Sequence, residues 1–165
     1  MVKQLLLPLA AVALFVILVG VFVKDPGKFG LQNASTVSTP SPSAKEIKVG
    51  NVNLNVSVAD NAQKRAKGLS GTESLNENGG ILFVFDSENA SPSFWMKDML
   101  IPLDIIWIND GKVVQIDKNA QPPEKGAKDS SLLLYKSKVK VDYVLEVNAG
   151  FAEKNNIKVG TDVSI

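Results

Sequence analysis

Two carboxylates and one arginine are the residues of this chain whose types and surroundings most suggest chemistry. Asp104 stands within Pro-Leu-Asp-Ile-Ile-Trp-Ile and Glu146 within Tyr-Val-Leu-Glu-Val, so both acids are embedded in apolar stretches. An isolated buried charge is costly, and each acid therefore needs a partner or a ligand. Arg65 is the only arginine among 18 basic residues, and its planar guanidinium can hold a carboxylate in two-point contact even when buried.

These three residues admit two interpretations. In the first, Arg65 forms a structural ion pair with Asp104 or Glu146 and fixes a helix on a sheet. In the second, the three side chains line a polar site in a cleft, with Lys97 as a further member. A hydrolase would use Asp104 and Glu146 as an acid/base pair. In a glycosidase such carboxyls lie roughly 5–9.5 Å apart and face an open groove.

The aromatic residues Phe94, Trp95 and Trp107 also have two interpretations. Aromatic side chains in alternating apolar strands usually belong to the core, but these three could instead form a stacking platform for a sugar ring or another flat ligand. Trp95 and Lys97 share one strand parity, so one face of this segment can carry an aromatic ring and a cation together.

The composition excludes several classes of site. The chain has no histidine and no cysteine, which removes Ser-His-Asp and Cys-His catalysis, Cys/His zinc sites, iron–sulfur clusters and disulfides. A metal would have to be a hard cation held by oxygens, yet the oxygen-rich segment 86–93 lacks the spacing and glycine of a calcium loop. We therefore predict no metal and no cofactor. A net charge of +1 also gives no electrostatic case for nucleic acid.

Residues 1–23 are predicted to form an N-terminal transmembrane anchor. The nineteen residues 5–23 carry no charge and as a helix would span roughly 28 Å, close to the ~30 Å hydrocarbon core of a bilayer. A signal peptide usually has a shorter apolar core of about 7–15 residues before a small-residue cleavage site, which favours an uncleaved anchor here. The head before this helix is too short to carry a domain, so we expect a single-pass cell-membrane protein with its C-terminal domain outside the cytoplasm.

The rest of the chain divides into a linker and a domain. Residues 24–44 form a linker rich in Ser, Thr and Pro that cannot bury a core. Residues 45–165 form a β-rich domain, in which residues 46–58 alternate cleanly around a Gly50-Asn51 turn. Further strands are predicted at 81–85, 102–108, 112–116, 138–147 and 160–165, with a hairpin at Asn109-Asp110-Gly111. Short helices are expected at 61–67, between an Asp60 N-cap and Gly68, and at 149–155.

This pattern predicts a mostly β fold: a compact β-sandwich or barrel-like domain with one or two short helices, preceded by a single transmembrane helix.

Five short blocks, in order, resemble the domain of unknown function 192 family of exported or membrane-tethered prokaryotic proteins. The blocks are Arg65-Ala-Lys-Gly68-Leu69, Gly80-Ile-Leu82-Phe83-Val-Phe85, Phe94-Trp95-Met96-Lys97, Pro102-Leu103-Asp104 and Tyr143-Val144-Leu145-Glu146…Ala149-Gly150. The resemblance covers roughly residues 50–163 and implies a compact β-sandwich-like fold with no established activity. Ser70, Ile81 and Asp98-Met99 depart from the family's usual pattern, and the late loop lacks the cysteines that many members carry.

The favoured function is that of a non-enzymatic module outside the cytoplasmic membrane. Such a module would bind a small ligand, an envelope component or a partner protein through a cleft near Trp95 and Asp104. The alternative is the carboxylate-dependent hydrolase, acting on envelope glycans. Whether Arg65, Asp104 and Glu146 surround one solvent-accessible cavity is the observation that best separates these possibilities.

Overall fold

Strands are the main regular secondary structure in the part of the chain that this computed structural model describes, residues 44–85 and 90–165. Seven of them form one sheet in the order β6-β5-β8-β3-β2-β1-β9. Their bounds are β1 Lys45–Val49, β2 Val52–Ala59, β3 Gly79–Val84, β5 Leu103–Asn109, β6 Lys112–Ala120, β8 Tyr143–Asn148 and β9 Val163–Ser164. Neighbours pair antiparallel except β2 and β3, which are parallel.

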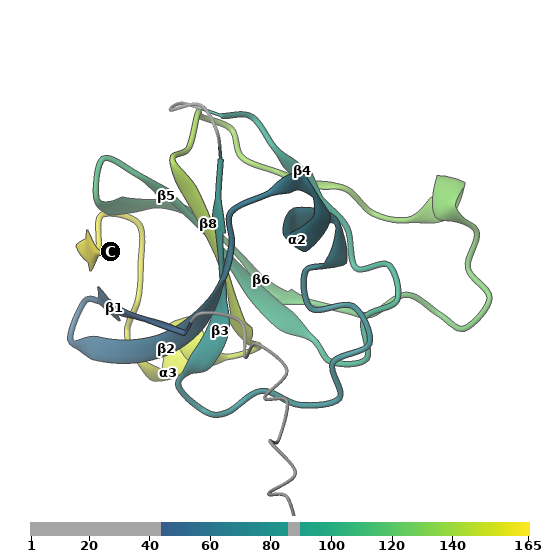
Figure 1. Cartoon of the computed structure of the whole chain (residues 1–165), viewed down its shortest axis with the longest axis horizontal. Coiled ribbons are helices and arrows are strands. Elements are labelled where there is room, and N and C mark those ends of the chain that lie inside the picture. The colour runs from purple at the N-terminus through teal and green to yellow at the C-terminus, as the bar shows by residue number, and fades with distance from the viewer. Residues whose placement is uncertain (1–43, 86–89) are drawn as a thin grey trace, which may run out of the picture. The chain divides into compact units, whose positions relative to one another are not determined.

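The sheet curls until its two edge strands almost meet (Figure 1). Lys112, the first residue of β6, forms an isolated β-bridge with Asp162, which directly precedes β9. The backbone N–H of Val163 donates to the carbonyl of Gly111 at 2.7 Å. The result is a nearly closed, barrel-like sheet, which confirms the mostly β prediction and favours the barrel over the sandwich.

The remaining elements are short. The helix α2, Ala62–Lys67, connects β2 to β3, and α3, Phe151–Lys154, follows β8. The strands β4, Ser93–Phe94, and β7, Tyr135–Lys136, pair as a separate two-stranded sheet, and a 3₁₀ turn spans Asp129–Ser131. The two short helices confirm the prediction, whereas the small sheet was not predicted.

Two tight turns confirm the predicted turn at Gly50-Asn51 and the predicted hairpin at Asn109-Asp110-Gly111. The β1–β2 hairpin turns at Gly50-Asn51 and the β5–β6 hairpin at Asp110-Gly111. Asp110 and Gly111 have φ of 49° and 65°, the positive values that a two-residue type I′ turn requires at both positions.

Two sequence predictions need correction. The N-cap of α2 is Asn61, whose side chain accepts from the Lys64 N–H at 2.9 Å, whereas Asp60 forms an ion pair with the Lys64 ammonium. The strand predicted at 138–147 begins only at Tyr143.

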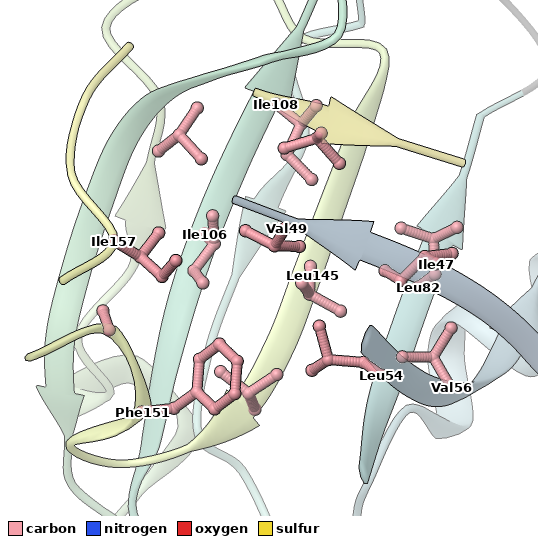
Figure 2. Close-up of a cluster of buried hydrophobic side chains, with 14 residues drawn as sticks. Ile47, Val49, Leu54, Val56, Leu82, Ile106, Ile108, Leu145, Phe151 and Ile157 are labelled. Atoms are coloured by element: carbon pink, nitrogen blue, oxygen red, sulfur yellow. The ribbon is translucent and has the colours of Figure 1, made fainter. Parts of the chain in front are cut away.

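One hydrophobic core lies inside the curl of the sheet (Figure 2). It brings together residues of strands that are not neighbours in the sheet, such as Val49 on β1 and Ile108 on β5, because the sheet closes on itself. Phe151 and Ala152 of α3 and Ile157 complete this core. The alternation of Leu54 and Val56 with exposed asparagines in β2 places the apolar face of that strand inward, as the sequence predicts.

A second core covers the outer face of the central strands. Successive residues of β3, β5 and β8 are buried on both faces, so these strands carry side chains into both cores. The outer core consists of Ala59, Leu69, Ile81, Phe83, Met96, Met99, Leu103, Ile105, Trp107, Ala120, Val141 and Val144. Its cover comes largely from the segments that follow α2 and β4, and a cavity opens between this cover and the sheet.

The predicted anchor at residues 1–23 lies outside the described residues, as does the linker up to residue 43. Within residues 44–85 and 90–165, no helix is long and apolar enough to cross a membrane.

Candidate functional site

The candidate site is a cavity of about 480 Å³ between α2, the segment around β4 and the outer face of β3 and β8. Its wall is mainly aromatic and aliphatic, its rim carries cations, and Glu146 lies among its lining residues. Its lining includes Arg65, Lys67, Phe85, Phe94, Trp95 and Glu146. Two further hollows of about 350 and 490 Å³ are lined mainly by loop residues, and none of their described lining residues is a buried ionisable side chain.

Glu146 reaches this cavity from the middle of the sheet. In β8 it pairs with Ile81 of β3 and Ile105 of β5, so apolar strands flank it on both sides. The residue is only 5% exposed, and burial raises the pKa of its carboxyl to about 8. Within the described residues, no hydrogen bond or ion pair reaches this carboxyl. Most buried polar groups are hydrogen-bonded within the protein. Among the described residues only Asn109 Oδ1 is a fully buried side-chain atom without a partner, so the Glu146 oxygens keep contact with the open cavity.

Asp104 has a different environment, although it too is fully buried. Its carboxylate accepts hydrogen bonds from the backbone N–H groups of Asn119 at 2.9 Å, Gly150 at 3.2 Å and Ala152 at 2.9 Å. The last two N–H groups belong to the first turn of α3, where free backbone donors and the helix dipole favour a negative group. The register of β5 with β6 shifts between Leu103 and Ile105, and Asp104 fixes both α3 and this irregular part of β6 to β5.

The expected ion pair of Arg65 is not formed, which corrects the first interpretation. Within the described residues, no salt bridge joins Arg65 to Asp104 or Glu146. Arg65 Nη1 instead donates to the Val84 carbonyl at 2.8 Å, and the guanidinium lies 6.0 Å from the centre of the Phe85 ring. The backbone N–H groups around Asp104 make a cationic partner unnecessary there.

The two acids also point to opposite faces of the sheet, which removes the acid/base pair. Asp104 lies opposite Val147 and Ile105 lies opposite Glu146 in the β5–β8 ladder. Val147 belongs to the interior core and Ile105 to the outer core, and directly paired residues share a face. The Asp104 carboxylate thus lies inside the barrel while Glu146 faces the cavity outside it. Two carboxyls separated by the sheet cannot flank one glycosidic bond.

The three aromatic residues selected from the sequence occupy different places: the rim of the cavity, its wall and the core behind it. Trp95 is 47% exposed at the rim, with the Lys97 ammonium 5.5 Å from its ring centre. Phe94 lines the cavity and makes edge-to-face contacts with Phe83 and Trp107, at centroid distances of 4.8 and 5.6 Å. Trp107 is fully buried, and its indole N–H donates to Asp117 at 2.6 Å, so it belongs to the core behind Phe94.

Of the seven residues selected from the sequence, the cavity therefore collects Arg65, Lys97, Phe94, Trp95 and Glu146, but neither Asp104 nor Trp107. The sequence reasoning missed Lys67, Phe83 and Phe85, which line the same cavity. Phe83 and Phe85 stand two residues apart at the end of an apolar strand, and this shared parity was the available signal.

Comparison with known proteins gives a family and two similar structures. The first structure is a protein from Sinorhizobium meliloti 1021 described as a proposed transcription regulator; it is 26% identical, with a TM-score of 0.67, over 75% of this chain and 95% of that one. The second is a protein of unknown function from Novosphingobium aromaticivorans DSM 12444, 27% identical, with a TM-score of 0.66, over 74% of this chain and 85% of that one. No curated protein matches. The family model of the domain of unknown function 192, an uncharacterised group, matches residues 45–165, and the chain belongs to this family.

Proposed function

We propose that the domain is a non-enzymatic binding module that takes a small ligand in the cavity over Glu146. The observation that carries this proposal is the Glu146 carboxyl, which is 5% exposed, lines the cavity and receives no hydrogen bond within the described residues. A polar group that is largely withdrawn from water and has no protein partner costs up to roughly 1–3 kcal/mol of stability. A ligand that supplies the missing hydrogen bond recovers this energy, which is a reason for the group to be there.

The cavity has the general character of a small-molecule site. Its volume of about 480 Å³ lies within the usual range of roughly 300–1,000 Å³. Phenylalanine side chains supply a flat apolar wall, and a single carboxyl supplies direction. Glu146 stands on a central strand held by neighbours on both sides, so its position is fixed before a ligand arrives.

The membrane location belongs to the same proposal. The uncharged run at residues 5–23 supports a bilayer anchor, and the Ser/Thr/Pro-rich residues 24–44 support a flexible tether to an extracytoplasmic domain. The ligand would then be a small molecule or envelope component outside the cytoplasm. Protease added to intact spheroplasts should remove the domain, whereas full protection would contradict this topology.

A thermal-shift screen of the full chain in detergent against a library of small polar aromatic and aliphatic compounds tests the binding function. We expect hits that raise the melting temperature of the wild type but not of a Phe94→Ala, Glu146→Ala double variant. Lys48→Ala, on the exposed face of β1, is the matched surface control and should retain the hits. Hits that survive the double variant, or a library without hits, would contradict a ligand site at this cavity.

A further inference from the structure

We propose that the ligand is a small organic carboxylate, whose apolar body lies against the phenylalanine wall and whose anionic end accepts a hydrogen bond from the Glu146 carboxyl. This inference rests on the proposed binding function and adds the chemical class of the ligand. It follows from three features of the cavity: the charge of its rim, the state of its buried carboxyl and the shape of its wall.

The rim of the cavity is cationic. Among the lining residues within 44–85 and 90–165, Arg65, Lys67 and Lys97 are basic and only Glu146 is acidic. Lys97 is paired with Asp129, which lies outside this lining, while the Lys67 ammonium donates to the neutral carbonyl of Ser70. An excess of positive over negative side chains attracts ligands of the opposite sign, so the described rim, with Lys67 bound only to a neutral carbonyl, favours an anion.

The buried carboxyl is suited to an anion as well. Glu146 is enclosed between Ile81 and Ile105, and desolvation there favours the neutral form of the carboxyl. A neutral carboxyl has one O–H donor, and an O–H that donates to a carboxylate forms a short, charge-assisted bond. An ammonium ligand would instead require an ionised Glu146 and would approach past the cationic rim.

The wall limits the body of the ligand. Phe83, Phe85 and Phe94 come from two different segments and line the same cavity, and Leu69 and Met99 add aliphatic surface. Aromatic rings pack against such a wall edge-to-face or offset, as Phe83 and Phe94 already do at 4.8 Å. A flat or branched apolar body of the size of one substituted aromatic ring fits within this cavity of about 480 Å³.

Three probes of similar shape and different charge test the proposal: benzoate, benzylammonium and benzyl alcohol. Trp95 and Trp107 are the only two tryptophans of the chain, so the full chain labelled with ¹⁵N-tryptophan in nanodiscs gives two indole signals. Titration at pH 7 should shift the Trp95 signal, with benzoate binding at least several-fold more tightly than the other two probes. Trp107 lies behind Phe94 and is the internal reference.

The pH dependence of benzoate binding has a defined sign. Benzoate keeps its charge from pH 7 to 9, while the Glu146 proton that it needs is lost from the free protein around pH 8. Its Kd should therefore rise about tenfold between pH 7 and 9 by proton linkage. Glu146→Gln retains a donor but cannot ionise, so this variant should bind benzoate at pH 7 within a few-fold of the wild type and lose the pH effect.

A matched lysine pair tests the rim. Lys67→Gln should weaken benzoate several-fold and leave benzyl alcohol unchanged, whereas Lys64→Gln, one helical turn earlier and outside the cavity lining, should change neither. Benzylammonium binding that is tighter than benzoate binding, or a benzoate affinity that rises with pH, would overturn the proposed carboxylate ligand. Either result would still agree with the proposed binding function. Benzyl alcohol binding as tight as benzoate binding, with neither affinity changed by Lys67→Gln, would also overturn the proposed carboxylate ligand. No shift with any probe overturns this inference, and the library screen then decides the binding function separately.

Discussion

Asp104 and Glu146 are buried carboxyls on adjacent strands, and they differ in what surrounds their oxygens. Three backbone N–H groups surround the Asp104 carboxylate, so its negative charge is held by donors that cannot move away. Glu146 faces a cavity and has no such donors within the described residues. The first arrangement stabilises the fold, whereas the second leaves hydrogen-bonding capacity for another molecule.

Asp104→Asn is expected to destabilise the protein by about 1–3 kcal/mol, because an amide NH₂ would face backbone N–H groups that need an acceptor. A thermal melt should show a midpoint lower by several degrees. Asp110→Asn is the matched control: Asp110 is exposed and has a φ of 49°, which asparagine accepts, so little change is expected. An unchanged midpoint for Asp104→Asn would mean that these hydrogen bonds do not hold α3.

Glu146 should make the stability of the protein depend on pH. Its pKa rises from 4.5 to about 8 on folding, so between these values the native state holds a proton that the unfolded state has lost. Stability should therefore fall as pH rises from about 5 to 8, with a slope that approaches ~1.4 kcal/mol per pH unit. Denaturant melts of wild type and Glu146→Gln across pH 5–9 isolate this contribution. A stability difference between the two that does not grow with pH would contradict it.

The sequence identified Asp104 and Glu146 as unusual because a charge within an apolar run is visible in one dimension. Their partners were not predictable in the same way. The donors to Asp104 are backbone groups at Asn119, Gly150 and Ala152, and residue types say nothing about where a backbone N–H points. The predicted Arg65–acid pair was wrong for this reason: backbone N–H groups at the start of α3 take the place of a cation at the Asp104 carboxylate.

At the scale of elements, β3 depends on a close approach to β8. A Cβ added at Gly80 would lie 2.5 Å from the Glu146 carbonyl oxygen and 3.0 Å from a methyl of Val147. Backbone atoms in the centre of a sheet cannot yield as a side chain does. The absence of a side chain at Gly80 therefore sets how closely β3 and β8 pair, and with it the position of Glu146.

Gly80→Ala should cost about 1–3 kcal/mol or more through overpacking, and should change the Trp95 environment if β3 moves. The control is Gly126→Ala, where the new methyl meets no atom within 4 Å but φ is 83°, so that variant measures backbone strain alone, about 1–2 kcal/mol. Guanidinium melts of both variants give the comparison. A smaller loss for Gly80→Ala than for Gly126→Ala would show that the strands can separate at little cost.

Local patterns were sufficient for the hairpins and the short helices, since turn residues, caps and period-2 alternation act over a few positions. They did not reveal that β2 and β3 pair in parallel or that β4 and β7 form a small sheet, because these contacts join distant segments. The registers of β8 with β3 and β5 place Glu146 and Asp104 on opposite faces. A shift of one residue would have put both on one face, and no sequence signal fixes that choice.

At the scale of the whole domain, the barrel interior and the outer core differ in how they are packed and in whether they leave a cavity. The interior contains the Asp104 carboxylate and is otherwise filled by aliphatic side chains and Phe151. The outer core is assembled from loops, short strands and both methionines of the 96–99 segment, and its packing leaves the cavity over Glu146. A rigid barrel that carries a less regular cover is a physical arrangement in which a binding site can vary without loss of the fold.

The domain should fold without the N-terminal 44 residues. Residues 45–165 contain every strand of the barrel and carry 15 basic and 16 acidic residues, a net charge of −1 that does not require a membrane surface. We expect this fragment to be soluble and to melt cooperatively within about 2 °C of the full chain in detergent. A 52–165 fragment is the informative comparison, because it lacks β1, to which β9 pairs, and should melt well below the longer fragment. Equal melting of the two fragments would mean that closure of the barrel through β1 and β9 contributes little to its stability.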